Sequence, residues 1–190
     1  MNCFYWFSWL ISKIIFSTVY RRIIIGLENL PKSGPYILAS NHNSYADPPL
    51  IGSCINKETY YIAKKELFKI PIFGWLIKKT NAFPIDRESG DVGALKNAIK
   101  ILSDGNSLLV FPEGTRANIG KVRKLKNGVA MLSVTSGSPV VPVAIINSDK
   151  LLSFKRLKVH FGLPMIFDAS QNYDSITNKI MSEVERLKRL

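Results

Sequence analysis

The sequence has little cysteine and little histidine, and each shortage argues against a class of protein. Only two of its 190 residues are cysteine and two are histidine. Cys3 and Cys54 lie far apart and form no C-x-x-C pair, so we expect no disulfide framework and a reducing compartment. Cys54 is predicted to be an ordinary core residue. Because the two histidines are distant and no ligand cluster accompanies them, no metal site is expected.

Acidic residues are also scarce, with 14 Asp and Glu against 26 Lys and Arg, which gives a formal net charge of +12. Such a surface attracts anions, whether nucleic acid, anionic lipid or an acidic protein. No zinc-finger or RNA-binding signature is present, so we do not expect a nucleic-acid partner. A hydrophobic content of 46% excludes a disordered chain, and the length suits one well-packed domain.

The chain lacks an apolar run long enough for a confident membrane span. Its most hydrophobic stretch, residues 3–20, is shorter than the run of about 20 residues that a span needs, and it carries Lys13. The stretch is rich in Trp and Tyr, which favour the membrane–water boundary, and two arginines follow it. We therefore expect residues 1–20 to form an interfacial helix. A full span and a soluble helix capping the core are the alternatives.

Strand and helix patterns alternate through residues 21–190, which predicts a single α/β domain with a mostly parallel mixed sheet flanked by helices. Short apolar runs predict strands at residues 23–25, 35–40, 58–63, 82–85, 107–111, 139–146 and 157–161. Periodicity and turn residues predict helices at residues 48–55, 91–104, 128–135 and 173–190. Asp174 is predicted to cap the last helix.

Residues 64–79 combine large apolar side chains with five lysines, and Pro71 divides them into two short helices. An apolar patch with a basic rim predicts a second membrane contact. Ordinary core packing beside a solvated lysine face is an equally good interpretation.

The strongest chemical signal lies at a strand-to-helix turn. The predicted strand at residues 35–40 continues into NHNSYADPP, and the two prolines suit the first turn of a helix. His42 and Asp47 then lie at the carboxyl end of a strand, where open α/β sheets place their ligand sites. A carboxylate on one imidazole nitrogen leaves the other nitrogen to accept a proton. For the pair alone, a hydrogen-bonded turn in which Asp47 caps the helix is the plainer interpretation.

A second turn, FPEGTR at residues 111–116, leaves the predicted strand at residues 107–111. Glycine lets a backbone N–H group approach an anion or an oxyanion closely. The forked guanidinium of Arg116 suits a phosphate. The alternative is a plain turn that carries a surface arginine.

Together, NHNSYAD and FPEGTR resemble the 1-acylglycerol-3-phosphate acyltransferases, a family marked by H-x4-D and, roughly seventy residues on, by F-P-E-G-T-R. Two weaker blocks are also similar to the family, NAFPIDR at residues 81–87 and VVPVAI at residues 140–145. The resemblance covers roughly residues 20–165, with four blocks in the family's order. It implies that the protein transfers a fatty acyl group from an acyl thioester to the hydroxyl of lysophosphatidic acid, which gives phosphatidic acid.

The resemblance implies a role for each site residue. His42 would take the proton of the acceptor hydroxyl while Asp47 orients the imidazole. No acyl-enzyme nucleophile is expected, because the sequence has no G-x-S-x-G and neither cysteine lies in a motif. The predicted substrate-binding residues are Arg87, Glu113, Gly114, Thr115 and Arg116. Of these, the two arginines would hold the acceptor phosphate, and amides near Gly114 would stabilise the oxyanion.

The expected partners are a lysophospholipid, an anionic membrane surface, and either acyl-CoA or acyl carrier protein as donor. No cofactor beyond this co-substrate is expected. Two other functions stay open. One is the same chemistry on glycerol 3-phosphate or an amino-acid lysolipid, and the other is a non-catalytic module that binds membranes or acidic proteins. The expected location is the cytoplasmic face of the cell membrane, with residues 1–20 as the interfacial helix and residues 21–190 as the acyltransferase domain.

Overall fold

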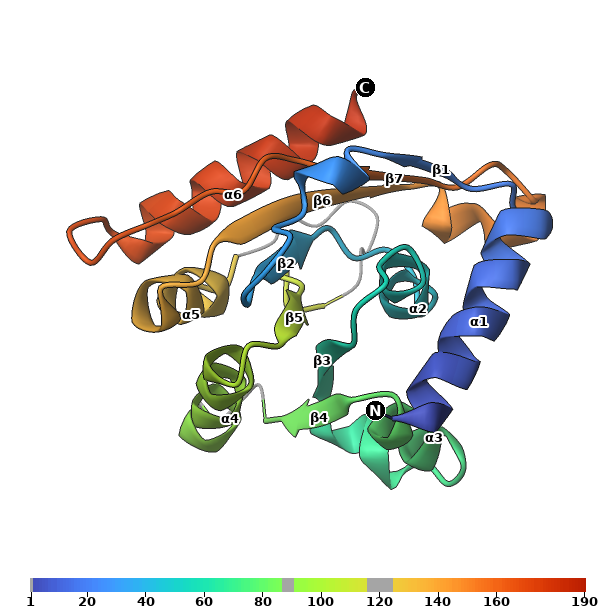
Figure 1. The fold of residues 1–190 in the computed structure, drawn as a ribbon, viewed down its shortest axis with the longest axis horizontal. Helices are drawn as coiled ribbons and strands as arrows, with labels where there is room; N and C mark the ends of the chain where they lie inside the picture. Colours follow the sequence, from blue (N-terminus) through green and yellow to red (C-terminus); the bar gives the residue numbers. More distant parts are fainter. Residues whose placement is uncertain (1, 87–90, 116–124) are drawn as a thin grey trace.

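The described residues form a seven-stranded sheet in the order β1-β7-β6-β2-β5-β3-β4 (Figure 1). The computed structural model describes residues 2–86, 91–115 and 125–190. The strands are β1 (Ile23–Ile25), β2 (Ile37–Ser40), β3 (Thr59–Lys64), β4 (Ala82–Ile85), β5 (Ser107–Val110), β6 (Val140–Ile146) and β7 (Lys158–Phe161). Neighbouring strands are parallel except β6 and β7, so β1 and β7 run against the other five. This confirms the predicted mostly parallel mixed sheet.

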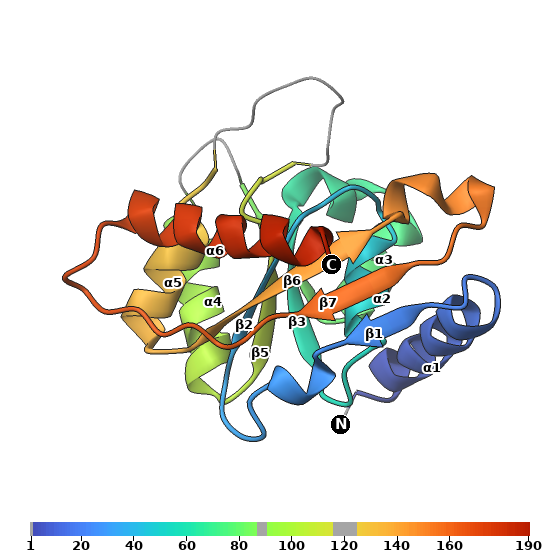
Figure 2. The same ribbon diagram turned by 90° about the horizontal axis from the view of Figure 1, so that it is seen from above.

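Helices cover both faces of this sheet (Figures 1 and 2). The α-helices are α1 (Cys3–Thr18), α2 (Asp47–Gly52), α3 (Phe73–Lys79), α4 (Val92–Ser103), α5 (Gly128–Ser136) and α6 (Tyr173–Lys188). The short 3-10 helices in the described part of the chain are η1 (Leu27–Asn29), η2 (Lys65–Lys69) and η3 (Ser148–Ser153). The helices α1 and α2 cover one face, while α4, α5 and α6 cover the other (Figure 1).

The central strand β2 shows why the sheet needs helices on both sides. All four of its residues are buried, and successive side chains of a strand point to opposite faces. Leu38 packs into the apolar cluster under α1 and α2, whereas Ile37 and Ala39 pack into the cluster under α4, α5 and α6. A parallel strand buried on both faces is continuously apolar, as this one is.

Two predicted helix caps are wrong. The cap of α2 is Ala46, and Asp47 is the first helical residue, because its carboxylate turns back to bind amides that precede the helix. The cap of α6 is Asn172, whose side-chain oxygen accepts a hydrogen bond from the backbone N–H of Asp174. Asn172 has the extended backbone that a capping residue requires, and Asp174 already lies inside the helix.

Residues 64–79 form two short helices, η2 and α3, as Pro71 predicts. They pack closely, since a Cβ added to Gly74 would lie 2.4 Å from the backbone oxygen of Phe68. Ile72 is 83% exposed and Trp75 is also exposed, so core packing does not account for these two side chains. The membrane contact stays a prediction.

The N-terminal helix α1 packs against the domain along one side only. Tyr5 and Phe16 are buried, and the indole N–H of Trp9 donates to the carbonyl of Ile55 at 2.8 Å. Its other side exposes large apolar residues. Within the part of the chain that the structure describes, no helix combines the length and the apolar character that crossing a membrane requires. The division into an interfacial helix and a domain that begins at residue 21 stays a prediction.

Candidate active site

Two neighbouring parallel strands bring the two sequence motifs together. Strand β2 pairs with β5 in parallel, with Ala39 opposite Val110. The segments that follow them begin at Asn41 and Phe111 and therefore leave the sheet side by side at the carboxyl edge. This edge is where open α/β sheets bind their ligands.

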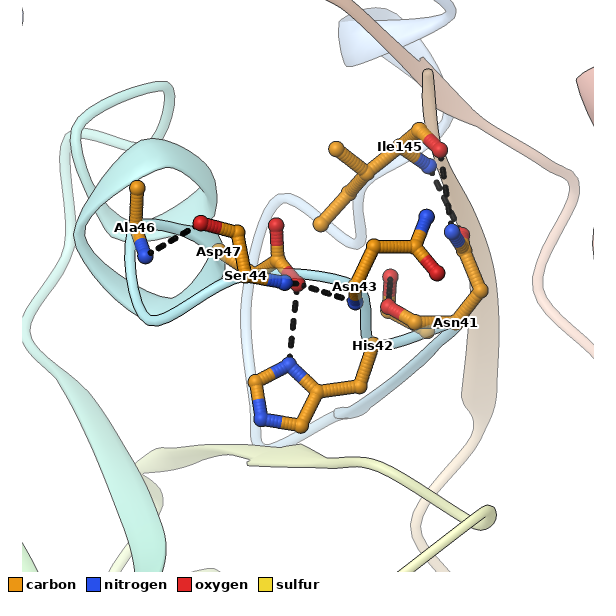
Figure 3. A network of polar contacts seen from close by, with 8 residues as sticks. Asn41, His42, Asn43, Ser44, Ala46, Asp47 and Ile145 are labelled. Atoms are coloured by element: carbon orange, nitrogen blue, oxygen red, sulfur yellow. Dashed lines mark hydrogen bonds and ion pairs between the residues drawn. The ribbon is translucent and has the colours of Figure 1, made fainter. Parts of the chain in front are cut away.

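Asn41 holds the backbone directly before His42. Its side-chain amide donates to the carbonyl of Ile145 at 2.9 Å, and its side-chain oxygen accepts from the Ile145 N–H at 2.8 Å (Figure 3). The side chain thus continues the ladder between β2 and β6 after the strands have diverged. Asn41 is 1% exposed, and each polar atom of its side chain has a partner through these two bonds. The sequence analysis overlooked it, although a polar residue at the end of a buried strand was a usable signal.

Asp47 gathers the turn around one carboxylate oxygen. Its Oδ2 lies 2.9 Å from Nδ1 of His42 and accepts the backbone N–H groups of Asn43 at 2.7 Å and Ser44 at 2.8 Å (Figure 3). The side chain is fully buried, and a buried carboxylate needs such donors to offset its lost hydration. The structure therefore places the predicted pair of His42 and Asp47 in direct contact.

The geometry assigns a role to each imidazole nitrogen of His42. With Nδ1 donating to Asp47, Nε2 is the nitrogen with a free lone pair, and it points away from the carboxylate (Figure 3). The ring of Phe111 stacks on the imidazole with centroids 4.0 Å apart and planes 18° apart. Hydrogen bond and stacking together fix the plane of the imidazole. The sequence indicated Phe111 only as part of a motif. Its stacking on His42 is a tertiary contact between the segments that follow β2 and β5.

A cavity of about 650 Å³ opens beside His42. It lies between α1, α2 and the segment from β3 to β4, and its wall includes Phe111 and Thr115. Most of its lining is apolar, including the side chains of Phe7, Ile11, Leu67, Phe73, Leu76 and Ile77. Among the described residues of the lining, the cationic side chain is Lys64, the last residue of β3. Its ammonium lies 3.6 Å from the carboxylate of Glu66, and both side chains are partly exposed.

Two tyrosine hydroxyls line the cavity on the side of α1 and β3. The hydroxyls of Tyr5 and Tyr61 lie 3.5 Å apart, and Tyr5 also accepts the backbone N–H of Thr59. Burial, reinforced by the neighbouring Tyr5 hydroxyl, raises the pKa of Tyr61 well above its usual value, so the phenol stays neutral. A Cβ added to Gly52 would lie 2.1 Å from the Tyr61 hydroxyl, so a larger residue here would displace that hydroxyl.

The second motif forms a tight turn beside the imidazole. Gly114 has a left-handed φ of 68°, and its N–H donates to the carbonyl of Phe111 at 2.9 Å. That amide is therefore committed to the turn, so any oxyanion donors would be other amides nearby. The stem of Lys126 passes next to Gly114, within 3.2 Å of the position a Cβ would take. Thr115 is part of the cavity wall, and Glu113 precedes it by two residues in the chain.

Two of the predicted phosphate ligands cannot be placed. Arg87 and Arg116 lie outside the residues that the structure describes, as do the basic residues between positions 117 and 124. The described part of the site thus brings together His42, Asp47 and Thr115 with the cavity and with Lys64. The sequence analysis had assigned Lys64 only to the basic rim of residues 64–79.

Comparisons with known proteins agree on one family. A family model described as "Acyltransferase" matches residues 21–146. A 1-acyl-sn-glycerol-3-phosphate acyltransferase of Bacillus subtilis is 31% identical over 157 residues, which covers 80% of this chain and 78% of the relative. An enzyme of that name from Streptococcus pneumoniae is 33% identical and covers 80% of this chain and 60% of the relative.

The chain spans a smaller share of its plant relatives. The chloroplast 1-acyl-sn-glycerol-3-phosphate acyltransferase LPAT1 of Arabidopsis thaliana is 35% identical over 70% of this chain but only 38% of the relative. Among solved structures, the 1-acyl-sn-glycerophosphate acyltransferase PlsC from Thermotoga maritima matches 97% of this chain and 79% of its own. Its TM-score is 0.75 at 29% identity.

Proposed function

This chain belongs to the acyltransferase family, and from that premise we propose that it acylates the free hydroxyl of lysophosphatidic acid from an acyl thioester, giving phosphatidic acid. The observation that carries the proposal is the arrangement of His42. Its Nδ1 is bound to a buried carboxylate while its Nε2 remains available beside an apolar cavity. The names of the relatives support the acceptor.

The site supplies general base catalysis without a covalent intermediate. Nε2 of His42 accepts the proton of the acceptor hydroxyl as its oxygen attacks the thioester carbonyl. Asp47 stabilises the imidazolium that forms, because its Oδ2 lies 2.9 Å from Nδ1 of His42. When the tetrahedral intermediate collapses, the C–S bond breaks and the thiolate takes the proton back from Nε2.

The cavity is suited to a fatty acyl chain. Its volume of about 650 Å³ lies within the usual range for ligand pockets, about 300–1,000 Å³. Apolar walls favour a hydrocarbon chain, because its transfer from water buries apolar surface. His42 lies in the wall, so a chain held there would present its carbonyl carbon near Nε2.

Cationic side chains would hold the acceptor phosphate. Lys64 lies in the cavity wall and is a candidate from the described residues. Arg87 and Arg116 stay predicted ligands on the strength of their motifs, and Glu113 stays predicted to orient an arginine or to bind an acceptor hydroxyl. Charge-assisted hydrogen bonds to phosphate are stronger than hydrogen bonds between neutral groups. Cationic residues at the site therefore suit a phosphorylated acceptor better than an uncharged one.

The protein would work at a membrane surface, because both acceptor and product are lipids. We place it at the cytoplasmic face of the cell membrane, with α1 in the interface. The exposed apolar side of α1 and the exposed Ile72 and Trp75 support this location. Acyl-CoA and acyl carrier protein both stay candidate donors.

A radiolabelled acyl-thioester assay against a panel of acceptors tests the proposal. The panel holds lysophosphatidic acid, glycerol 3-phosphate and an amino-acid lysolipid, each with acyl-CoA and with acyl carrier protein as donor. We expect transfer to lysophosphatidic acid and none by the matched variant His42→Gln. Transfer only to another acceptor would support acyl transfer as the reaction but reject lysophosphatidic acid as the acceptor. Absence of transfer to every acceptor, with binding to vesicles, would reject the enzyme in favour of a binding module.

A further inference from the structure

The N-terminal and C-terminal helices use their apolar residues in opposite ways. Both are 16 residues long and both lie against the sheet. Helix α6 buries six residues of its inner face, whereas α1, which is the more apolar of the two, buries only Tyr5 and Phe16. The exposed large apolar residues of α1 and of the turn after it are Phe7, Leu10, Ile11, Ile14, Ile15 and Val19. Part of α1 therefore has no covering partner among residues 2–86, 91–115 and 125–190.

A second apolar feature stands beside the end of α1. Leu152 in η3 is 95% exposed, and Phe154 directly after η3 is 63% exposed. The ring of Phe154 stacks on Tyr20 with centroids 6.0 Å apart and planes 17° apart, which ties η3 to the end of α1. Both figures show the segment after β6 and the end of α1 at the same end of the molecule (Figures 1 and 2).

The backbone at Phe154 is strained. Its φ is 50°, in the left-handed region, where glycine and asparagine are tolerated far better than a bulky residue. A large aromatic at an exposed, strained position adds little to folding. Strain of this kind is more often kept for a functional contact than for stability.

We propose that Leu152 and Phe154 form a membrane-insertion loop, which together with the exposed side of α1 docks this protein onto an anionic phospholipid bilayer. We name these exposed residues of α1 and η3 the α1–η3 face. The inference rests on the proposed function, because a lipid substrate is what gives the protein a reason to sit on a bilayer.

The charge around the α1–η3 face selects a bilayer as its occupant. Lys13 and Arg21 flank the apolar side of α1, and Lys150, Lys155 and Arg156 flank the loop, all of them exposed. Across residues 1–22 and 147–156 the sequence contains a single acid, Asp149. A symmetric pairing of two copies through this face would bring like charges together, at a cost. Anionic head groups would instead offset them while the apolar tips enter the hydrocarbon.

This face also borders the cavity beside His42. Phe7 and Ile11 of α1 are both exposed and part of the cavity lining. A bilayer on the α1–η3 face would therefore lie against the outer wall of the cavity. An acyl chain would then have a short apolar path from the leaflet to the imidazole.

The first test reports the depth of the loop. In a Cys3→Ser background, Leu152→Cys is labelled with the fluorophore NBD. Buried Cys54 does not compete, because burial raises the pKa of its thiol to about 12. The matched control is Ile166→Cys. Ile166 is 80% exposed but follows Met165, which pairs with Val140 at the opposite end of β6 from η3.

With vesicles containing phosphatidylglycerol, we expect a blue shift of NBD emission at position 152 and quenching by lipids brominated in the acyl chain, with neither at position 166. Equal emission at both positions on vesicle-bound protein would overturn the proposal. A protein that does not bind the vesicles at all would overturn it as well.

The second test measures binding and chemistry separately. In vesicle sedimentation, the double variant Leu152→Ser/Phe154→Asn should have a partition coefficient roughly tenfold lower than the wild type. The reason is that two large apolar side chains no longer enter the hydrocarbon. Ile166→Ser should leave it unchanged. Turnover of the double variant on a short-chain, water-soluble lysophosphatidate should equal that of the wild type, since neither residue is in the site.

The outcomes distinguish this inference from the proposed function. If the wild type acylates lysophosphatidate but the double variant still binds vesicles like the wild type, the inference fails and the function stands. If no variant transfers an acyl group but the double variant releases the protein from vesicles, the function fails and the surface stands. Dissociation of a dimer by the double variant with unchanged vesicle binding would assign the face to a second copy and overturn the inference.

Discussion

The protein has two histidines, and the structure gives them opposite surroundings. Nδ1 of His42 lies 2.9 Å from the Asp47 carboxylate, and Nδ1 of His160 in β7 lies 2.8 Å from the backbone oxygen of Leu187. The two rings are thus anchored through the same nitrogen at nearly the same distance. Their Nε2 atoms differ. That of His42 is beside a cavity, and that of His160 is buried without a partner among the described residues.

The difference shows what turns an anchored imidazole into a base. A carboxylate stabilises the imidazolium that proton transfer creates, whereas a neutral carbonyl does so far less. Space at Nε2 is the second requirement, and the core around His160, which is 1% exposed, leaves no room for a substrate. These contacts give His160 a structural role in the core.

The largest expected effect comes from removing the imidazole beside the cavity. His42→Ala should lower turnover by about 10²- to 10⁴-fold, the usual cost of losing a general base. The variant should stay folded, with a modest fall in melting temperature, because Asp47 keeps the backbone N–H donors of Asn43 and Ser44. Turnover measured beside a thermal melt checks this. Near-normal turnover would show that His42 is not the base.

The second prediction concerns Lys64, a cationic residue that lines the same cavity as His42. Lys64→Gln should raise the Michaelis constant for lysophosphatidate roughly tenfold or more, because a charge-assisted bond is worth about 1.5–3 kcal/mol. The constant for the thioester donor should change much less. Steady-state kinetics with each substrate varied in turn measure both, and equal changes would remove Lys64 from the phosphate site.

On the other side of the comparison, His160→Leu should lower the free energy of unfolding by about 1–3 kcal/mol, because the buried carbonyl of Leu187 loses its donor. Turnover per folded molecule should be unchanged. Urea unfolding provides the measurement. His160→Asn is the matched control, since its amide can supply the same donor and should recover part of the loss. A loss of turnover at full stability would break the comparison.

The smallest effect is expected at the stacked ring. Phe111→Leu keeps an apolar side chain beside His42 but removes the aromatic plane, which is worth about 0.5–1.5 kcal/mol in such pairs. Turnover should fall about two- to tenfold, with little change in either Michaelis constant. The same substitution at a ring far from the site, Phe154→Leu, should leave turnover on a soluble acceptor unchanged.

Much of the fold was predictable because its signals are local. Continuous apolar runs such as residues 107–111 predicted buried strands, and β5 is the strand observed there. Pro71 predicted the break between η2 and α3. The helix caps at Asp47 and Asp174 were wrong, because a carboxylate next to a helix start has several possible donors. Which of them it binds depends on how the preceding turn is folded.

The sequence by itself determined the α/β alternation, the pairing of His42 with Asp47 across five residues, and the glycine turn of the second motif. All three depend on residues close together in the chain. Only the tertiary structure decided that β2 lies beside β5 and that Phe111 stacks on His42. It also decided that Asn41 binds Ile145, and that α1 and Lys64 line the same cavity. The physical reason is that such contacts join distant segments. The packing of whole elements selects them, and no local spacing encodes it.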